Sequence, residues 1–234
     1  NNLGVDLLRQ GRLDEARAQL LAALKINPGY ADPHNNLGTA LEAQGRFDEA
    51  MQHYREALRR KPDFPDAHYN LGIALSRQGR SDEAAAEFER VLELRPNDAE
   101  AHNNLGVLWQ RKGNLEEATR RYMAAVRLKP DYANAHYNLG SALARQGRLE
   151  QAINEFQEAL RLKPDYSEAH NNFGLALLAR GNLKEAIASF GKAVSIRPDF
   201  AEAHNNLGVA LQGEDLLEEA AASFDKALLI KPDY

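Results

Sequence analysis

The sequence contains no cysteine, which excludes disulfide bonds, thiolate nucleophiles and cysteine-ligated zinc sites. No run of 18 apolar residues occurs, so no membrane-spanning helix is predicted. Acidic residues outnumber basic ones, giving a net charge of −5 and a pI of about 5.8. This balance argues against binding nucleic acid or an anionic membrane through a basic patch. None of these absences identifies a cellular compartment.

Catalytic motifs are also missing. The chain has no glycine-rich phosphate loop, no nucleophile elbow and no HExxH sequence. Its carboxylates gather where helices are expected to begin, a position that suits the helix dipole. We therefore expect a protein that is not an enzyme and that uses no cofactor. An apolar share of 44% and a charged share of 27% are typical of a folded chain.

What the sequence has in abundance is a repeat. The string His-(Asn/Tyr)-Asn-(Leu/Phe)-Gly returns every 34 residues, which is the mark of a solenoid whose units contact mainly their neighbours. We predict an all-α protein, a right-handed α-solenoid of seven stacked helix–turn–helix repeats forming a single array over residues 1–234. With the recurrent glycine as position 8, the units are 1–30 (truncated), 31–64, 65–98, 99–132, 133–166, 167–200 and 201–234.

Each unit reads as two helices. In residues 31–64 the first helix carries Leu37 and Leu41 on one face and ends at Gly45, because glycine readily adopts the left-handed conformation of a helix C-cap. The second helix ends before Pro62, which cannot continue it. In the last unit Asp215 replaces the turn glycine, and we interpret this as a local change in the hairpin.

The units share a further pattern. Position 8 is glycine, position 20 is alanine, position 24 is large and mostly aromatic, and position 32 is proline. In this pattern the chain resembles the tetratricopeptide repeat family along its whole length. The Ala-His-Asn-Asn-Leu-Gly form of the repeat is most similar to the repeats of O-linked N-acetylglucosamine transferases, without their catalytic part. The resemblance implies a scaffold that binds other proteins.

Position 6 is asparagine in every unit, although asparagine costs roughly 0.6 kcal/mol relative to alanine inside a helix. Its place between apolar positions directs it away from the hairpin core, toward the concave face that the first helices line. An amide can both donate to and accept from a peptide backbone. We therefore expect an extended peptide or protein segment to bind along a groove lined by Asn2, Asn36, Asn70, Asn104, Asn138, Asn172 and Asn206.

The groove has two expected flanks. Position 2 is mostly acidic and position 13 is often arginine, so we expect a ligand that carries both charges. The flanking residues are Asp66, Glu100 and Glu168 on the acidic side and Arg77, Arg111 and Arg145 on the basic side.

Two alternatives remain open. Each asparagine amide could instead bond to a neighbouring helix and fix how the repeats stack, a role compatible with ligand contact. The chain begins within a repeat and has no evident polar cap at either end, so we expect either a piece of a longer protein or head-to-tail self-assembly into a filament.

Histidine recurs at position 4 in six units. Histidines one hairpin apart are about 8–10 Å from each other and cannot share a metal ion, so we expect them to pack between helices. If they are neutral there, acid should loosen the stack. His53 falls outside this row, and we place it alone on the outer surface of a second helix.

Overall fold

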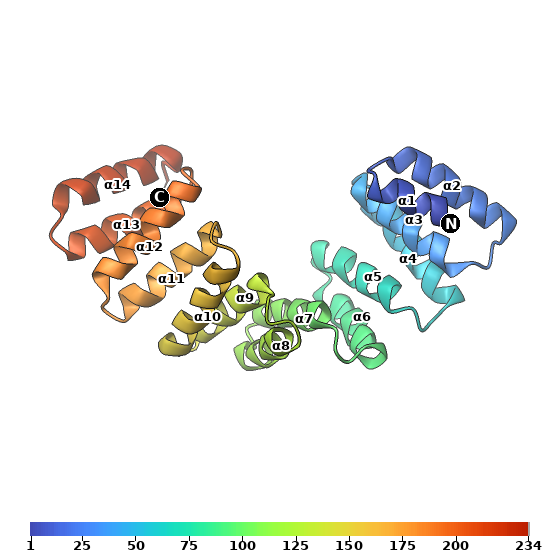
Figure 1. Cartoon of the computed structure of the whole chain (residues 1–234), viewed down its shortest axis with the longest axis horizontal. Coiled ribbons are helices and arrows are strands. Elements are labelled where there is room, and N and C mark those ends of the chain that lie inside the picture. The colour runs from blue at the N-terminus through green and yellow to red at the C-terminus, as the bar shows by residue number, and fades with distance from the viewer. Residues whose placement is uncertain (234) are drawn as a thin grey trace. The chain divides into compact units, whose positions relative to one another are not determined.

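The computed structural model describes residues 1–233, which form α-helices joined by short turns and contain no β-strand. Figure 1 shows the helices in chain order. They are α1 (Asn2–Arg9), α2 (Leu13–Ile26), α3 (Ala31–Ala43), α4 (Phe47–Arg60), α5 (Pro65–Arg77), α6 (Ser81–Leu94), α7 (Ala99–Arg111), α8 (Leu115–Leu128), α9 (Ala133–Arg145), α10 (Leu149–Leu162), α11 (Ser167–Ala179), α12 (Leu183–Ile196), α13 (Ala201–Gly213) and α14 (Leu217–Ile230). One helical hairpin in each 34-residue repeat confirms the predicted all-α repeat fold.

The contacts divide the chain into two compact units, Asn1–Leu108 and Trp109–Tyr234, with the boundary inside α7. The first unit holds the hairpins α1/α2, α3/α4 and α5/α6. The second holds α8 and the hairpins α9/α10, α11/α12 and α13/α14. That the repeats form one array over residues 1–234 stays a prediction.

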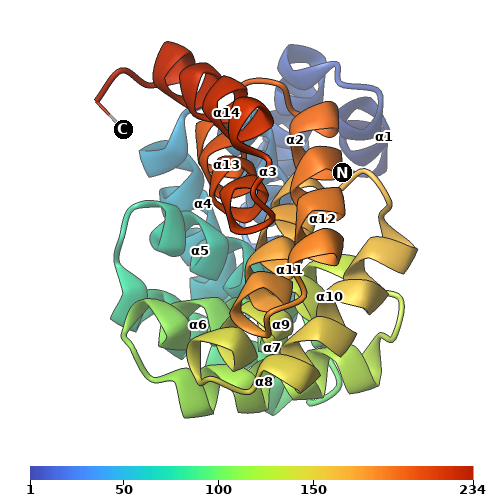
Figure 2. The same ribbon diagram turned by 90° about the vertical axis from the view of Figure 1, so that its left-hand side faces the viewer.

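Within each unit the hairpins stack in order. The second helix of one hairpin packs on the first helix of the next, as α2 does on α3 and α10 on α11. First helices of successive hairpins also contact one another, α1 with α3 and α3 with α5 in the first unit, α9 with α11 and α11 with α13 in the second. Figure 2 shows the hairpins α11/α12 and α13/α14 packed side by side. Each of the two compact units therefore has a row of first helices, one from each of its hairpins.

The two helices of a hairpin approach closely because position 8 has no side chain. A Cβ added at Gly140 would lie 2.8 Å from Cε1 of Phe156, the fully buried ring at position 24 of the same hairpin. Ala152 at position 20 is also fully buried. The glycine thus makes room for the aromatic ring that fills the core between the helices.

The turns between paired helices need a left-handed residue. Gly45 has φ +76°, and the turn glycines of the five other complete hairpin turns also have positive φ. Asp215 takes this place in the last hairpin with φ +58°, the one non-glycine residue with positive φ among those that the structure describes. Aspartate tolerates this region better than most residues, so the turn keeps the form it has in the other hairpins, and the expected change is confined to the residue type.

Candidate functional site: the row of first helices

The position-6 asparagines join successive first helices. In five of these asparagines the amide Nδ2–H donates to the side-chain oxygen at position 5 of the preceding repeat, 35 residues earlier. In the first unit the bonds are Asn36 to Asn1 (3.0 Å), Asn70 to Asn35 (3.0 Å) and Asn104 to the Tyr69 hydroxyl (3.1 Å). In the second unit they are Asn172 to the Tyr137 hydroxyl (3.0 Å) and Asn206 to Asn171 (3.0 Å).

These bonds link successive repeats, as the alternative role of the asparagines in stacking requires. Each bond uses the Nδ2–H donor of the asparagine and does not involve its Oδ1 acceptor. Within residues 1–233, no donor lies within hydrogen-bonding distance of Oδ1 of Asn36, Asn70 or Asn206. These three side chains are half-buried, whereas Asn2 is exposed. The inter-repeat bond therefore holds an amide whose oxygen has no donor within the described chain.

Several of the predicted flanking charges are paired within the chain. Asp66 accepts from Arg95 at 2.7 Å, and Glu168 accepts from Arg197 at 2.6 Å. Arg77 pairs with Glu42 of the preceding repeat. Two more predicted residues lie at helix ends. Glu100, at the start of α7, accepts from the Tyr69 hydroxyl at 3.4 Å, and Arg111 ends the same helix.

A pocket of about 480 Å³ opens in the second unit between α9 and α11. It brings together three predicted site residues, Asn138, Arg145 and Asn172. Their neighbours in the pocket were not predicted, because packing accounted for residues such as Phe156 and the repeat pattern gave no signal at Ala144 or Ala179. The remaining lining residues are Gln110, Tyr137, Ser141, Ala144, Leu149, Phe156, Leu175, Ala176 and Ala179.

The sequence matches known repeat models along most of its length. A model described as tetratricopeptide repeat matches residues 1–65, 137–199 and 171–234, and another of the same description matches residues 41–108. A model described as TPR repeat matches residues 111–147. This chain belongs to the tetratricopeptide repeat (TPR) family. It is a helical scaffold of the kind that binds proteins.

Solved TPR structures share its fold. MamA is 31% identical, with a TM-score of 0.64 over 70% of this chain and 95% of MamA. YrrB, described as a TPR protein with an unusual peptide-binding site, is 24% identical, with a TM-score of 0.67 over 79% of this chain and 95% of YrrB. PilF of Pseudomonas aeruginosa is 20% identical, with a TM-score of 0.78 over 87% of this chain and 93% of PilF. No curated protein matched the sequence.

Most of the position-4 histidines form hydrogen bonds to the loops that join successive TPR hairpins. In five of the six, Nε2 contacts the carbonyl oxygen of the proline six residues earlier. Because a carbonyl only accepts, Nε2–H is the donor. The pairs are His68 with Pro62 (2.8 Å), His102 with Pro96 (3.2 Å), His136 with Pro130 (3.1 Å), His170 with Pro164 (3.0 Å) and His204 with Pro198 (3.0 Å). The expected packing role is thus a specific hydrogen bond.

Two of these histidines also face a carboxylate at position 23. Nδ1 of His68 lies 2.6 Å from Glu87, and Nδ1 of His136 lies 2.7 Å from Glu155. Burial lowers the pKa of His68, but its bonds to Glu87 and the proline carbonyl outweigh burial and raise it. The hydrogen bond to Glu155 raises the pKa of His136. A raised pKa favours the protonated form, so protonation of these two histidines is not expected to loosen the stack.

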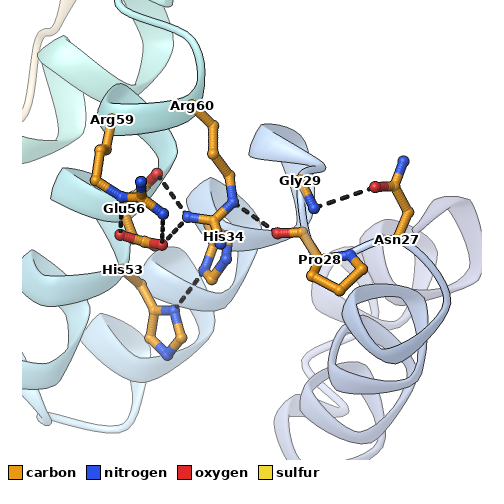
Figure 3. A network of polar contacts seen from close by, with 8 residues as sticks. All are labelled: Asn27, Pro28, Gly29, His34, His53, Glu56, Arg59 and Arg60. Carbon is orange, nitrogen blue, oxygen red and sulfur yellow. Dashed lines mark hydrogen bonds and ion pairs between the residues drawn. The ribbon is translucent and has the colours of Figure 1, made fainter.

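His34 is the exception, and Figure 3 shows why. Arg60 donates to the Pro28 carbonyl at 2.6 Å, taking the acceptor that the histidine uses in other repeats. His34 Nδ1 instead lies 3.0 Å from Nδ1 of His53, which stands at position 23. Burial, followed by the charge of Arg60, lowers the pKa of His34 to about 4. Burial also lowers the pKa of His53.

The placement of His53 alone on the outer surface is wrong, because its ring is half-buried against His34. His53 stands 19 residues after His34, but this spacing gave no signal in the sequence, because position 23 varies between repeats and is glutamate only at Glu87 and Glu155. Among residues 1–233 no group of three or more histidine, aspartate or glutamate side chains could hold a metal ion. None of the described helices has the length and apolar character needed to cross a membrane.

Proposed function

We propose that this TPR array binds an extended peptide or protein segment along its row of first helices, with the asparagine amides contacting the peptide backbone. The observation that supports this is Oδ1 of the half-buried residues Asn36, Asn70 and Asn206, held in place by the inter-repeat bond and left without a donor among residues 1–233. An oriented acceptor costs little further ordering when a ligand binds.

Geometry fits such a ligand. Packed helices lie about 8–10 Å apart, and an extended peptide advances about 3.3 Å per residue. One asparagine would therefore meet every third peptide residue. Backbone contacts of this kind give affinity with broad sequence preference. The description of YrrB as a peptide-binding TPR protein and the resemblance of the repeats to those of O-linked N-acetylglucosamine transferases are in keeping with this proposal.

The test uses a random library of dodecapeptides and two asparagines of the row whose Oδ1 has no donor. The selected peptide is titrated against the wild type, the double variant Asn36→Ala/Asn70→Ala and the control Asn154→Ala/Asn182→Ala, which lies outside the row. We expect the row variant to bind about tenfold more weakly, which corresponds to about 1.4 kcal/mol, and the control to bind normally.

The same variants report on stability. Each row substitution loses a hydrogen bond worth about 1 kcal/mol and gains about 0.6 kcal/mol of helix propensity. The free energy of unfolding should therefore change little. Failure of the wild type to capture any peptide would contradict the proposal. Marked destabilisation together with normal peptide affinity would show that the row only fixes stacking.

A second candidate function is self-association into a filament. It is favoured by large apolar side chains that stay exposed on two surfaces. Leu229 of α14 is 84% exposed, and Ile26 of α2 is 86% exposed. Exposed apolar surface of this kind is typical of contacts between chains.

A further inference from the structure

The pocket between α9 and α11 exists because two repeats carry small residues where others carry long ones. Ala144 occupies position 12, where Glu42 and Gln110 stand in earlier repeats. Ala179 occupies position 13, where Arg77 stands. The space that these alanines leave is bounded by Ala176, Leu175, Leu149 and Phe156.

This surface suits an apolar group. Phe156 is fully buried beneath it, and Leu175 is left 37% exposed beside it. The volume of about 480 Å³ lies within the range of small ligand sites, about 300–1,000 Å³. A leucine or phenylalanine side chain placed here would remove the exposed face of Leu175 from water, which is favourable.

Polar groups at the rim are already positioned. The Ser141 hydroxyl donates to the Tyr137 carbonyl at 2.9 Å. Asn172 donates to the Tyr137 hydroxyl at 3.0 Å and reaches Ser141 at 3.4 Å. Burial raises the pKa of the Tyr137 hydroxyl, and the negative charges of Glu168 and Glu202 add to this effect, so two carboxylates lie toward that side of the pocket. A carboxylate would therefore be repelled from that side.

Arg145 lies on the other side and lacks the partner that its position has elsewhere. Arg77, at the same position in the first unit, pairs with Glu42, 35 residues earlier. The residue 35 places before Arg145 is Gln110, which binds the Tyr122 hydroxyl at 3.2 Å just as Glu42 binds that of Tyr54. No carboxylate among residues 1–233 pairs with Arg145, and its side chain is exposed.

We propose that this pocket is a specificity subsite of the peptide groove, which takes an apolar side chain followed by an aspartate or glutamate whose carboxylate pairs with Arg145. The ligand's carboxylate would thus pair with Arg145 as the carboxylate of Glu42 pairs with Arg77 in the first compact unit. The inference rests on the proposed function, since it assumes that a peptide lies along the first helices. The asparagine amides contact the peptide backbone and do not distinguish its side chains, whereas this pocket would select an apolar side chain followed by an acidic one.

The experiment uses acetylated decapeptides with Gly-Ser flanks and a central pair. Leucine, phenylalanine or serine is followed by glutamate, glutamine or lysine, and binding is followed by fluorescence anisotropy. We expect the wild type to prefer Leu-Glu or Phe-Glu over the glutamine and lysine forms by about two- to fivefold, the range of an exposed ion pair. Replacing leucine by serine should also weaken binding.

Three variants of the full chain sharpen the test. Arg145→Glu should reverse the preference from glutamate to lysine. Gln110→Glu should abolish it, because the new carboxylate pairs with Arg145 as Glu42 pairs with Arg77. Arg127→Glu makes the same charge change on the exposed side of α8, away from the pocket, and should leave the preference intact.

The outcomes separate this inference from the function on which it rests. If no decapeptide binds the wild type and library selection also fails, the proposed function fails. If peptides bind through the asparagine row but glutamate, glutamine and lysine are equivalent, only the subsite is wrong. A glutamate preference that survives both Arg145→Glu and Gln110→Glu would equally overturn it.

Discussion

At the scale of single residues, glycine at position 8 sets the distance between the two helices of a hairpin. Glycine costs about 1 kcal/mol relative to alanine inside a helix, yet every 34-residue repeat has glycine at this position. The cost is accepted because the aromatic ring at position 24 occupies the space where a Cβ would stand. Gly191 in α12 has open space around it, so the same residue type serves no packing purpose there.

This contrast gives a matched pair of variants. Gly140→Ala should destabilise the protein, because Phe156 and the carbonyl of Ala152, 3.2 Å from the new Cβ, would have to move. Gly191→Ala should stabilise it by up to about 1 kcal/mol through helix propensity alone. Urea unfolding monitored by circular dichroism measures both. Equal stabilisation by the two alanines would refute the packing argument.

How far the site could be predicted also differs from residue to residue. The asparagine row was predicted because it repeats, and position 5 offered an acceptor, asparagine or tyrosine, in the preceding unit. The contact of His53 could not be predicted, since a histidine that occurs once carries no periodic signal. The pocket escaped prediction for another reason. It arises from what Ala144 and Ala179 lack, and missing volume becomes visible only when the neighbouring helices are in place.

At the scale of the helical element, the hairpin α3/α4 differs from its neighbours in how it responds to acid. The pKa of His34 falls from an ordinary 6.5 to about 4 in the folded chain. The unfolded chain therefore takes up a proton first, and stability is lost as the pH falls from about 6.5 towards 4. His34 is faced by His53, Arg59 and Arg60, with Glu49 acting on His53. The raised pKa of His136 acts oppositely, favouring the folded state below about pH 6.5.

We therefore expect acid to loosen residues 31–64 more than residues 133–166. Hydrogen–deuterium exchange at about pH 7.5 and about pH 5, corrected for intrinsic rates, should show protection lost in α3 and α4 and retained in α9 and α10. His53→Glu recreates the histidine–glutamate pair of other repeats and should remove most of the acid sensitivity. Uniform loss of protection across all hairpins, or an unchanged response in His53→Glu, would contradict this account.

At the scale of the whole molecule, the repeat period was enough to predict the fold, because each hairpin needs only its neighbours to bury its apolar face. The division into Asn1–Leu108 and Trp109–Tyr234 was not predicted, although Trp109 stands within α7 at position 11, where every other repeat carries leucine. Local contacts determine a hairpin, whereas the grouping of hairpins depends on small differences that a consensus pattern conceals.

Self-association is a property of the whole chain and is tested at that scale. If the exposed apolar side chains of α14 and α2 join copies of the protein, the average mass in light scattering should rise with concentration. Leu229→Asp should suppress the rise, while Met123→Asp, at another exposed apolar residue on α8, should not. A constant monomeric mass in the wild type at high concentration would exclude the filament.

The bond between position 6 and position 5 of the preceding repeat has a consequence for how such a chain can change in length. Its acceptor is either an asparagine or a tyrosine, and both hold the donor at 3.0–3.1 Å. Any deletion or duplication of 34 residues places a competent acceptor before a competent donor again. The contacts between repeats are thus equivalent. A gene encoding this protein can gain or lose whole 34-residue repeats, and the new junction keeps its hydrogen bond.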